Sequence, residues 1–189
     1  MTNGGNADQL RQLLEGGKNR GYVLYDDLDA LLPEDYESGP ELDKLLAAIE
    51  DEGIHIVADP TSDSVDQFEP VDDAPGDGIY PDNPVRLYAR EVGQLPRLTA
   101  EAEIRLAEEA RLGTENAERA KKDLVEANLR QPIVIARRYA DRGVHVLELI
   151  QAGNLGLLKA AGSFDSTRGY RFSAYAGWLA RRFIIRSLP

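Results

Sequence analysis

The sequence of 189 residues predicts an all-α protein: a small acidic helical domain, a flexible acidic linker and a larger helical bundle. Three observations lead to this prediction. Apolar residues recur at helical spacing through most of the chain, and proline and glycine punctuate the helical segments. One interior stretch combines prolines with acids and few apolar residues. Hydrophobic residues make up 42% of the chain, which is enough for a packed core.

Residues 7–57 are expected to form the small acidic domain. A leucine stripe over residues 10–14 predicts a first helix that ends at Gly16-Gly17. A second helical segment over residues 26–32 is stopped by Pro33, because proline lacks the N–H that would continue the helix.

A third helix in this domain is indicated by four apolar residues spaced as one helix face. They are Leu42, Leu45, Leu46 and Ile49. We expect this helix to end at Gly53, and the alternating residues 54–57 to form a short strand.

Residues 58–82 are expected to form a disordered acidic linker. They contain four prolines, two glycines and eight acids, but no base. Such a composition does not bury enough apolar surface to offset the entropy lost on ordering.

Residues 83–189 are expected to form the helical bundle. Pro84 opens its first helix, Thr99 can cap the second and Gly113 closes it. A third helix is predicted over residues 115–140, and Pro132 inside its pattern should kink or divide it.

Two further helices complete the predicted bundle. One runs from about Val146 to Gly162. The other starts near Ser173 and is expected still to run at Leu188-Pro189, so that the domain is truncated at its C-terminal end.

The net charge of −11 conceals two halves of opposite sign. Residues 1–82 carry 21 acids and 4 bases, whereas residues 83–189 carry 12 acids and 18 bases. Such a division favours nucleic-acid binding by the second half, with the first half as an acidic counterpart.

Several function classes are not supported by the composition. The chain has no cysteine, and its two histidines lie far apart, so we expect neither metal nor cofactor. We find no pairing of nucleophile and base and no glycine-rich phosphate loop, so an enzyme is not expected. Neither an export signal nor a run of about 20 apolar residues is visible, and we expect a cytoplasmic protein.

Aromatic and basic residues alternate in the segment from residue 164 to 186. Rings offer faces on which unstacked bases lie, and arginines hold phosphates, so this pattern favours single-stranded nucleic acid. Any one of these rings, taken alone, could instead be a core residue. The rings are Phe164, Tyr170, Phe172, Tyr175 and Trp178, and the arginines are Arg168, Arg171, Arg181, Arg182 and Arg186.

Three ordered blocks of the chain resemble the primary bacterial sigma factors of the sigma-70 family, the RNA polymerase subunits that recognise and melt promoters. Residues 7–57 resemble region 1.1, residues 83–113 region 1.2 and residues 121–189 region 2. The matching strings are Gly21-Tyr22, Leu32–Asp35 and Gly53-Ile54, then Asn83–Gly93 and Leu98–Glu101, and finally Glu126–Arg130, Leu149–Gly156 and Arg168–Ala176.

The resemblance implies a docking site for core RNA polymerase on the predicted helix over 146–162. In the family this helix contacts a coiled coil in the clamp of the β′ subunit. The positions that make this contact are Glu148, Gln151, Asn154 and Leu158. Ala152 departs from the family, in which an acid is usual. Amides on a helix are ordinary, and the residues alone would favour packing of this face inside its own domain.

The resemblance also implies how the aromatic–arginine segment binds promoter DNA. One adenine of the −10 non-template strand leaves the stack and enters a pocket, where the aligned residues are Phe164, Asp165, Arg168 and Tyr175. Tyr170 and Phe172 align with rings that face the melted strand. Arg181, Arg182 and Arg186 would hold phosphates or the upstream duplex, with Arg171 and Trp178 in the same DNA-binding surface.

Three positions depart from the family in the second half of this segment. Trp178-Leu179 stands where two tryptophans are usual, and Ile185 replaces a threonine. Arg182 stands where a glutamine usually reads the duplex at position −12.

Two functions follow from the resemblance. The first is a transcription initiation factor that binds core polymerase and the −10 element, with an acidic first domain that restrains DNA binding by the free protein. The alternative is a truncated sigma-like interaction module that binds the clamp and competes with full sigma factors without initiating.

Overall fold

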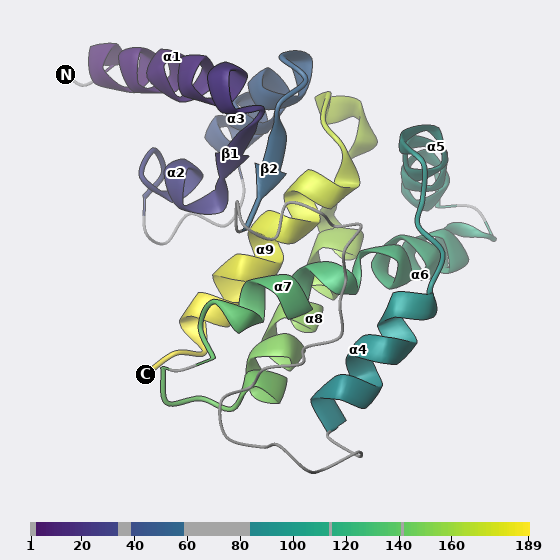
Figure 1. The fold of residues 1–189 in the computed structure, drawn as a ribbon. Coiled ribbons are helices and arrows are strands. Elements are labelled where there is room, and N and C mark those ends of the chain that lie inside the picture. Colours follow the sequence, from purple (N-terminus) through teal and green to yellow (C-terminus); the bar gives the residue numbers. More distant parts are fainter. Residues whose placement is uncertain (1–2, 34–38, 59–83, 114, 141) are drawn as a thin grey trace.

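The computed structural model describes residues 3–33, 39–58, 84–113, 115–140 and 142–189, and within them it confirms an all-α fold with one two-stranded sheet (Figure 1). All but the first residue of the predicted linker lies outside the described residues. Within the part of the chain that is described, no helix is both long and apolar enough to cross a lipid bilayer.

The acidic domain contains α1 (Asn3–Arg20), α2 (Tyr25–Asp29) and α3 (Pro40–Asp51). Strands β1 (Tyr22–Leu24) and β2 (His55–Val57) pair in parallel, and Val23 lies opposite Ile56. Strand β2 confirms the short strand expected over residues 54–57, which in the structure begins at His55. Its partner β1 has only three residues, too few for a periodic pattern to show.

The predicted end of the first helix at Gly16-Gly17 is wrong. Helix α1 continues to Arg20, and Gly21 follows in the left-handed conformation with a φ of 84°. A Cβ on Gly17 would lie 2.7 Å from a methyl carbon of Val23, so the glycine allows α1 to approach the sheet closely. A mid-helix glycine costs about 1 kcal/mol of helix propensity, which packing here offsets.

The bundle begins with α4 (Pro84–Gln94) and α5 (Ala100–Arg111). The predicted cap is confirmed, because the Thr99 hydroxyl oxygen accepts a hydrogen bond of 3.2 Å from the Ala102 N–H. Gly113 follows α5 with a φ of 63°, as expected for a residue that ends a helix.

The predicted third helix is divided, as the proline suggested. It forms α6 (Ala117–Asn128) and α7 (Arg130–Arg137), and Pro132 lies in the first turn of α7. A missing N–H is tolerated there because the first turn has no intrahelical acceptor for it.

Helices α8 (Val146–Ser163) and α9 (Phe172–Arg186) form the centre of the bundle, joined through the short 3₁₀ helix η2 (Ser166–Arg168). Helix α9 ends at Arg186, so the expectation that it still runs at Pro189 is wrong. A Cβ on Gly156 of α8 would lie 2.6 Å from the Cα of Ala180 in α9, which shows how closely the two backbones approach.

The acidic domain and the bundle share one continuous hydrophobic core. Val23, Tyr25 and Leu28 of the acidic domain belong to the same buried cluster as Trp178 and Leu179 of α9. Figure 1 shows β1, β2 and α2 lying beside α9. The acidic domain therefore packs against the helix that carries most of the predicted DNA-binding arginines.

Candidate nucleic-acid interface

The first half of the aromatic–arginine segment folds as a tight connection between α8 and α9. Asp165 caps η2, because its carboxylate accepts hydrogen bonds from the Thr167 N–H at 3.0 Å and from the Thr167 hydroxyl at 2.7 Å. Gly169 then turns the chain with a φ of 85°. The turn brings residues on both sides of η2 together.

Four of the predicted rings form one cluster at this connection. The ring centroid of Phe164 lies 5.4 Å from Phe172, 5.8 Å from Tyr170 and 5.9 Å from Tyr175. Tyr170, Phe172 and Tyr175 are buried, and Phe164 is partly exposed. The accessible ring of the cluster is therefore Phe164.

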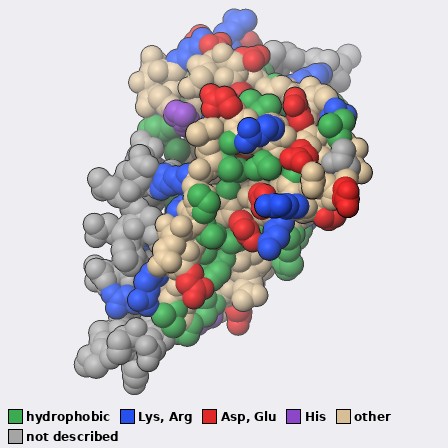
Figure 2. Space-filling view, turned by 90° about the vertical axis from the view of Figure 1, so that its right-hand side faces the viewer, with side chains coloured by type: hydrophobic (Ala, Val, Ile, Leu, Met, Phe, Trp, Pro, Cys, Tyr) green, Lys and Arg blue, Asp and Glu red, His purple; other side chains and the backbone are tan. Residues whose placement is uncertain are grey.

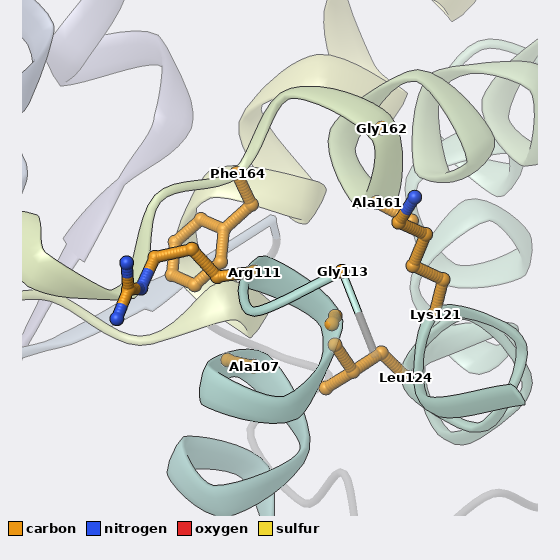
Figure 3. Close-up of a pocket in the computed structure, with 9 residues that line it drawn as sticks. Ala107, Arg111, Gly113, Lys121, Leu124, Ala161, Gly162 and Phe164 are labelled. Atoms are coloured by element: carbon orange, nitrogen blue, oxygen red, sulfur yellow. The ribbon is translucent and has the colours of Figure 1, made fainter. Parts of the chain in front are cut away.

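Phe164 also lines a cavity of about 300 Å³ between α5, α6 and the end of α8. The other walls of this cavity are formed by small residues, among them Ala107, Ala110 and Gly162, and by Arg111 and Lys121. In Figure 3 the side chain of Arg111 runs beside the Phe164 ring. The cavity thus combines an aromatic wall with two cations.

Two charged side chains beside the ring cluster have pKa values shifted by their neighbours. Hydrogen bonds from Thr167 and the nearby cations Arg168 and Arg111 hold the pKa of the Asp165 carboxyl below its usual value. A hydrogen bond to Asp43 raises the pKa of the Arg168 guanidinium. Both groups are therefore ionised at neutral pH.

Acids of the first domain contact the basic groups around the ring cluster. Asp43 of α3 accepts hydrogen bonds from Arg168 at 2.8 Å and from the Tyr170 hydroxyl at 2.6 Å. Burial and the bond to Asp43 raise the pKa of the Tyr170 hydroxyl, which stays protonated. Glu50, also of α3, forms a 2.7 Å ion pair with Arg171.

Further along α9, acids of α2 contact the next two arginines. Arg181 forms ion pairs with Asp26 and Asp29. Arg182 donates to the Asp29 carboxylate at 3.4 Å and to the Pro33 carbonyl at 3.3 Å. Burial lowers the pKa of the Arg181 guanidinium and the charge of Asp26 opposes that shift, so the ion pairs hold a cation inside the protein.

The two remaining predicted DNA-binding residues differ in solvent exposure. Trp178 is fully buried in the shared core, and the Arg182 guanidinium lies 5.3 Å from its ring centroid. Arg186 is exposed in the last turn of α9. The structure thus brings most of the predicted surface together, but in this conformation the acidic domain covers much of it.

Sequence reasoning missed the acids that cover this surface. An excess of acids was evident in the first half, yet the contacts made by Asp26, Asp29, Asp43 and Glu50 depend on tertiary packing. Arg138 of the bundle was missed as well, and it pairs with Asp26 at 3.1 Å.

The residues predicted to bind polymerase lie on α8, and three of the four are exposed. Glu148, Gln151 and Leu158 are accessible, whereas Asn154 donates a 2.9 Å hydrogen bond to the Tyr88 hydroxyl of α4. Leu155 was not predicted, but it is 57% exposed and lies on the same helix face, as does Leu158 at 58%. The face therefore presents two large apolar side chains to solvent.

Other exposed apolar side chains occur on α4 and α5. Leu87 lies on α4 and Ile104 on α5, and the exposed Leu112 directly follows α5. Figure 2 views the molecule from the side of these helices and shows hydrophobic side chains at the surface among acidic and basic ones.

Comparison with known proteins gives consistent matches along the chain. Residues 5–77 match the model of sigma-70 factor region 1.1, residues 83–115 that of region 1.2, and residues 124–188 that of sigma-70 region 2. The RNA polymerase sigma factor SigA of Clostridium acetobutylicum is 39% identical over 180 residues, covering 95% of this chain and 46% of the relative. SigA of Lactococcus lactis subsp. cremoris is 41% identical over 158 residues, covering 78% and 43%. The chain spans less than half the length of these relatives.

Proposed function

This chain belongs to the sigma-70 family, of which it carries regions 1.1, 1.2 and 2 in order, and on that premise we propose that it is a transcription initiation factor. It binds core RNA polymerase and recognises the promoter −10 element as single-stranded DNA. Its acidic domain restrains DNA binding by the free protein.

The observation that carries this proposal is the pairing of the acidic domain with the aromatic–arginine surface. Arg168, Arg171 and Arg181 each face a carboxylate of the acidic domain, where a DNA phosphate would also be stabilised. The carboxylates of the acidic domain therefore occupy positions that DNA phosphates would take beside these arginines. Its removal would expose several cations at once beside the ring cluster.

Base capture would use the partly exposed end of the ring cluster. Phe164 offers a face for stacking, which contributes about 1–3 kcal/mol per base. Asp165 and Arg168 lie next to it and supply an acceptor and donors for a base edge. Tyr175, whose ring centroid is 5.9 Å from Phe164, supports that wall from within the protein.

Polymerase binding would use the exposed face of α8. Glu148 and Gln151 supply polar groups, and Leu155 and Leu158 supply apolar area that is open to solvent. Such a mixed face suits an amphipathic partner such as the β′ clamp coiled coil.

The proposal is tested by binding a fluorescent single-stranded oligonucleotide that carries the −10 non-template sequence. With core polymerase present, we expect binding that weakens when the adenine at the second position is replaced. The matched control is the same oligonucleotide changed outside the −10 element. Absence of polymerase-dependent binding, or indifference to that adenine, would refute −10 recognition.

A second function, the sigma-like interaction module, is favoured by one observation. The α8 face is exposed to solvent, whereas acids of the first domain pair with Arg181 and Arg182 of α9. Such a module would compete with a full sigma factor for core polymerase. Its addition to core polymerase alone would leave binding of the −10 oligonucleotide unchanged. Measuring both properties in one titration separates the two functions.

A further inference from the structure

We propose that the cavity lined by Phe164 is a binding site for a free nucleoside monophosphate. Recognition of the −10 element requires no such ligand, and binding of the ligand to the cavity does not depend on the proposed function. Its effect on base capture does rest on the proposed function, because the ligand and the captured base would use the same Phe164 ring.

The cavity combines an aromatic wall and apolar walls with two cations. It measures about 300 Å³ and lies between α5, α6 and the end of α8. Leu124 and the ring of Phe164 are apolar walls, and Arg111 and Lys121 also line the space. In Figure 3, Arg111 lies beside Phe164, and Lys121 comes from α6 on the other side of the cavity. A ligand that uses all of these walls has both an aromatic ring and a negative charge.

A nucleotide carries these two features in one molecule. Its base has a π-face that stacks on an aromatic side chain, whichever base it is. Its phosphate is negatively charged and accepts charge-assisted hydrogen bonds from arginine and lysine. Inorganic phosphate would leave the Phe164 ring unused, and an uncharged aromatic molecule would leave the two cations unused.

Small residues leave room for such a ligand. Ala107, Ala110, Ala161 and Gly162 line the cavity, and a Cβ on Gly162 would meet no atom within 4 Å. A volume of about 300 Å³ lies at the lower end of the range for small-molecule sites. This size suits a single nucleotide better than a length of strand.

Both cations of the cavity lie where a phosphate can reach them. Arg111 is exposed in the last turn of α5. Lys121 forms a 2.7 Å ion pair with Glu118, whose side chain is 85% exposed. Ion pairs at an exposed surface contribute little to stability, so a phosphate can replace Glu118 beside Lys121 at little cost.

The acidic domain leaves this cavity uncovered in the part of the chain that the structure describes. The described residues that line it all belong to the bundle, whereas Arg168 and Arg181 pair with acids of the first domain. A free nucleotide can therefore bind before DNA reaches these arginines. Stacked on Phe164, it would compete with the captured base, so that nucleotide concentration would regulate base capture.

The test uses the full chain and isothermal titration calorimetry, with AMP as the probe. Adenosine lacks the phosphate, ribose 5-phosphate lacks the base, and inorganic phosphate is a plain anion. We expect AMP to bind about tenfold more tightly than each of these three, because each of them loses either the stacking or the charged contacts.

Two changes to the cavity should each weaken AMP binding about tenfold. Gly162→Leu places a side chain in the open space of the cavity, and circular dichroism melting checks that this variant folds. Arg111→Gln combined with Lys121→Gln removes the partners of the phosphate and should leave adenosine binding unchanged. The matched control is Arg105→Gln combined with Lys122→Gln, which removes the same charge from exposed positions of the same two helices outside the cavity. It should bind AMP as the unchanged chain does.

A second titration separates a free nucleotide from a nucleotide of the DNA strand. With core polymerase present, AMP should weaken binding of the −10 oligonucleotide to the unchanged chain but not to Gly162→Leu. If Gly162→Leu weakens oligonucleotide binding while AMP does not bind at all, the cavity takes a nucleotide of the strand. That result would overturn the inference of a free ligand.

The remaining outcomes also decide the inference. Equal affinities for AMP and inorganic phosphate overturn it, because the ring then takes no part in binding. Absence of AMP binding overturns it as well, and −10 oligonucleotide binding in the same preparation would leave the proposed function standing. AMP binding that is lost in Gly162→Leu supports the inference even where the oligonucleotide fails to bind, in which case only the proposed function fails.

Discussion

Gly177 is a residue at which the acidic domain approaches the α9 backbone closely. A Cβ at this position would lie 1.8 Å from the hydroxyl oxygen of Tyr25 and 2.4 Å from the amide oxygen of Gln131. Tyr25 is buried, and burial raises the pKa of its hydroxyl despite the nearby charge of Arg181. The absence of a side chain at Gly177 therefore makes room for the tyrosine.

We expect Gly177→Ala to lower the free energy of unfolding by about 1–3 kcal/mol, the usual cost of inserting a methyl group into a packed interior. The loss should shrink when Tyr25→Ala is combined with it, because the hydroxyl that collides with the new methyl is gone. Urea unfolding of the two single variants and the double variant measures the coupling. Additive effects would mean that Tyr25 does not occupy this space.

Single residues also show where sequence patterns stop being informative. The rings from Phe164 to Tyr175 were predicted to act together, and they do form one cluster. The contact of this cluster with a distant segment was not predictable, because the Tyr170 hydroxyl donates to Asp43 of α3. A pattern of residue types indicates what a surface can bind, but does not indicate what covers it.

Helices were well predicted where a local signal marks their ends. Thr99, Gly113 and Pro132 act within a few residues of their own position, and each marks a boundary or division that the structure confirms. The helix end predicted at Gly16-Gly17 was wrong, because a glycine is required at position 17 by the close approach of Val23 and not by the end of the helix. Propensity is overridden when packing supplies the larger free energy.

The contact between α8 and α9 offers a test of such packing. Gly156→Ala would push a methyl group against the backbone of Ala180, which cannot move aside as a side chain can. We expect a loss of about 2–3 kcal/mol in the free energy of unfolding, from overpacking against a rigid neighbour. Urea denaturation monitored by circular dichroism measures the change.

Gly162→Ala in the same helix is the matched control. A Cβ there would meet no atom within 4 Å, and alanine favours a helix over glycine by up to about 1 kcal/mol. We expect this variant to be neutral or slightly stabilised. Equal destabilisation by both substitutions would show that α8 and α9 do not pack at Gly156.

The whole molecule is organised by the opposite charges of its two parts. The acidic and basic halves were evident from composition, and the structure adds that carboxylates of one reach specific arginines of the other. Pairing of this kind cannot be read from the sequence, because 125 residues separate Asp43 from Arg168. Composition therefore predicted that the parts attract each other, but not which residues meet.

The specificity of this attraction leads to a prediction for the free protein. Neutralising three of the contacting acids together, as Asp26→Asn, Asp29→Asn and Asp43→Asn, removes the carboxylates of the acidic domain that face Arg168 and Arg181 and the Asp29 carboxylate that faces Arg182. Arg181 would then be a buried cation without its carboxylates, which strongly destabilises the packing of the acidic domain against α9. We expect binding of a single-stranded oligonucleotide, measured by anisotropy at low salt without polymerase, to tighten by about tenfold or more.

The control must separate lost contacts from lost charge. Neutralising three exposed acids of the same domain, as Asp8→Asn, Glu15→Gln and Asp51→Asn, changes the net charge equally. Long-range repulsion of DNA should fall by a similar amount in both triple variants, because it depends on net charge and is screened by salt. Only the first variant should retain its advantage over the control as salt rises to the physiological range. If the two variants bind alike at every salt concentration, the acidic domain acts through its net charge and not by occupying the arginines of α9.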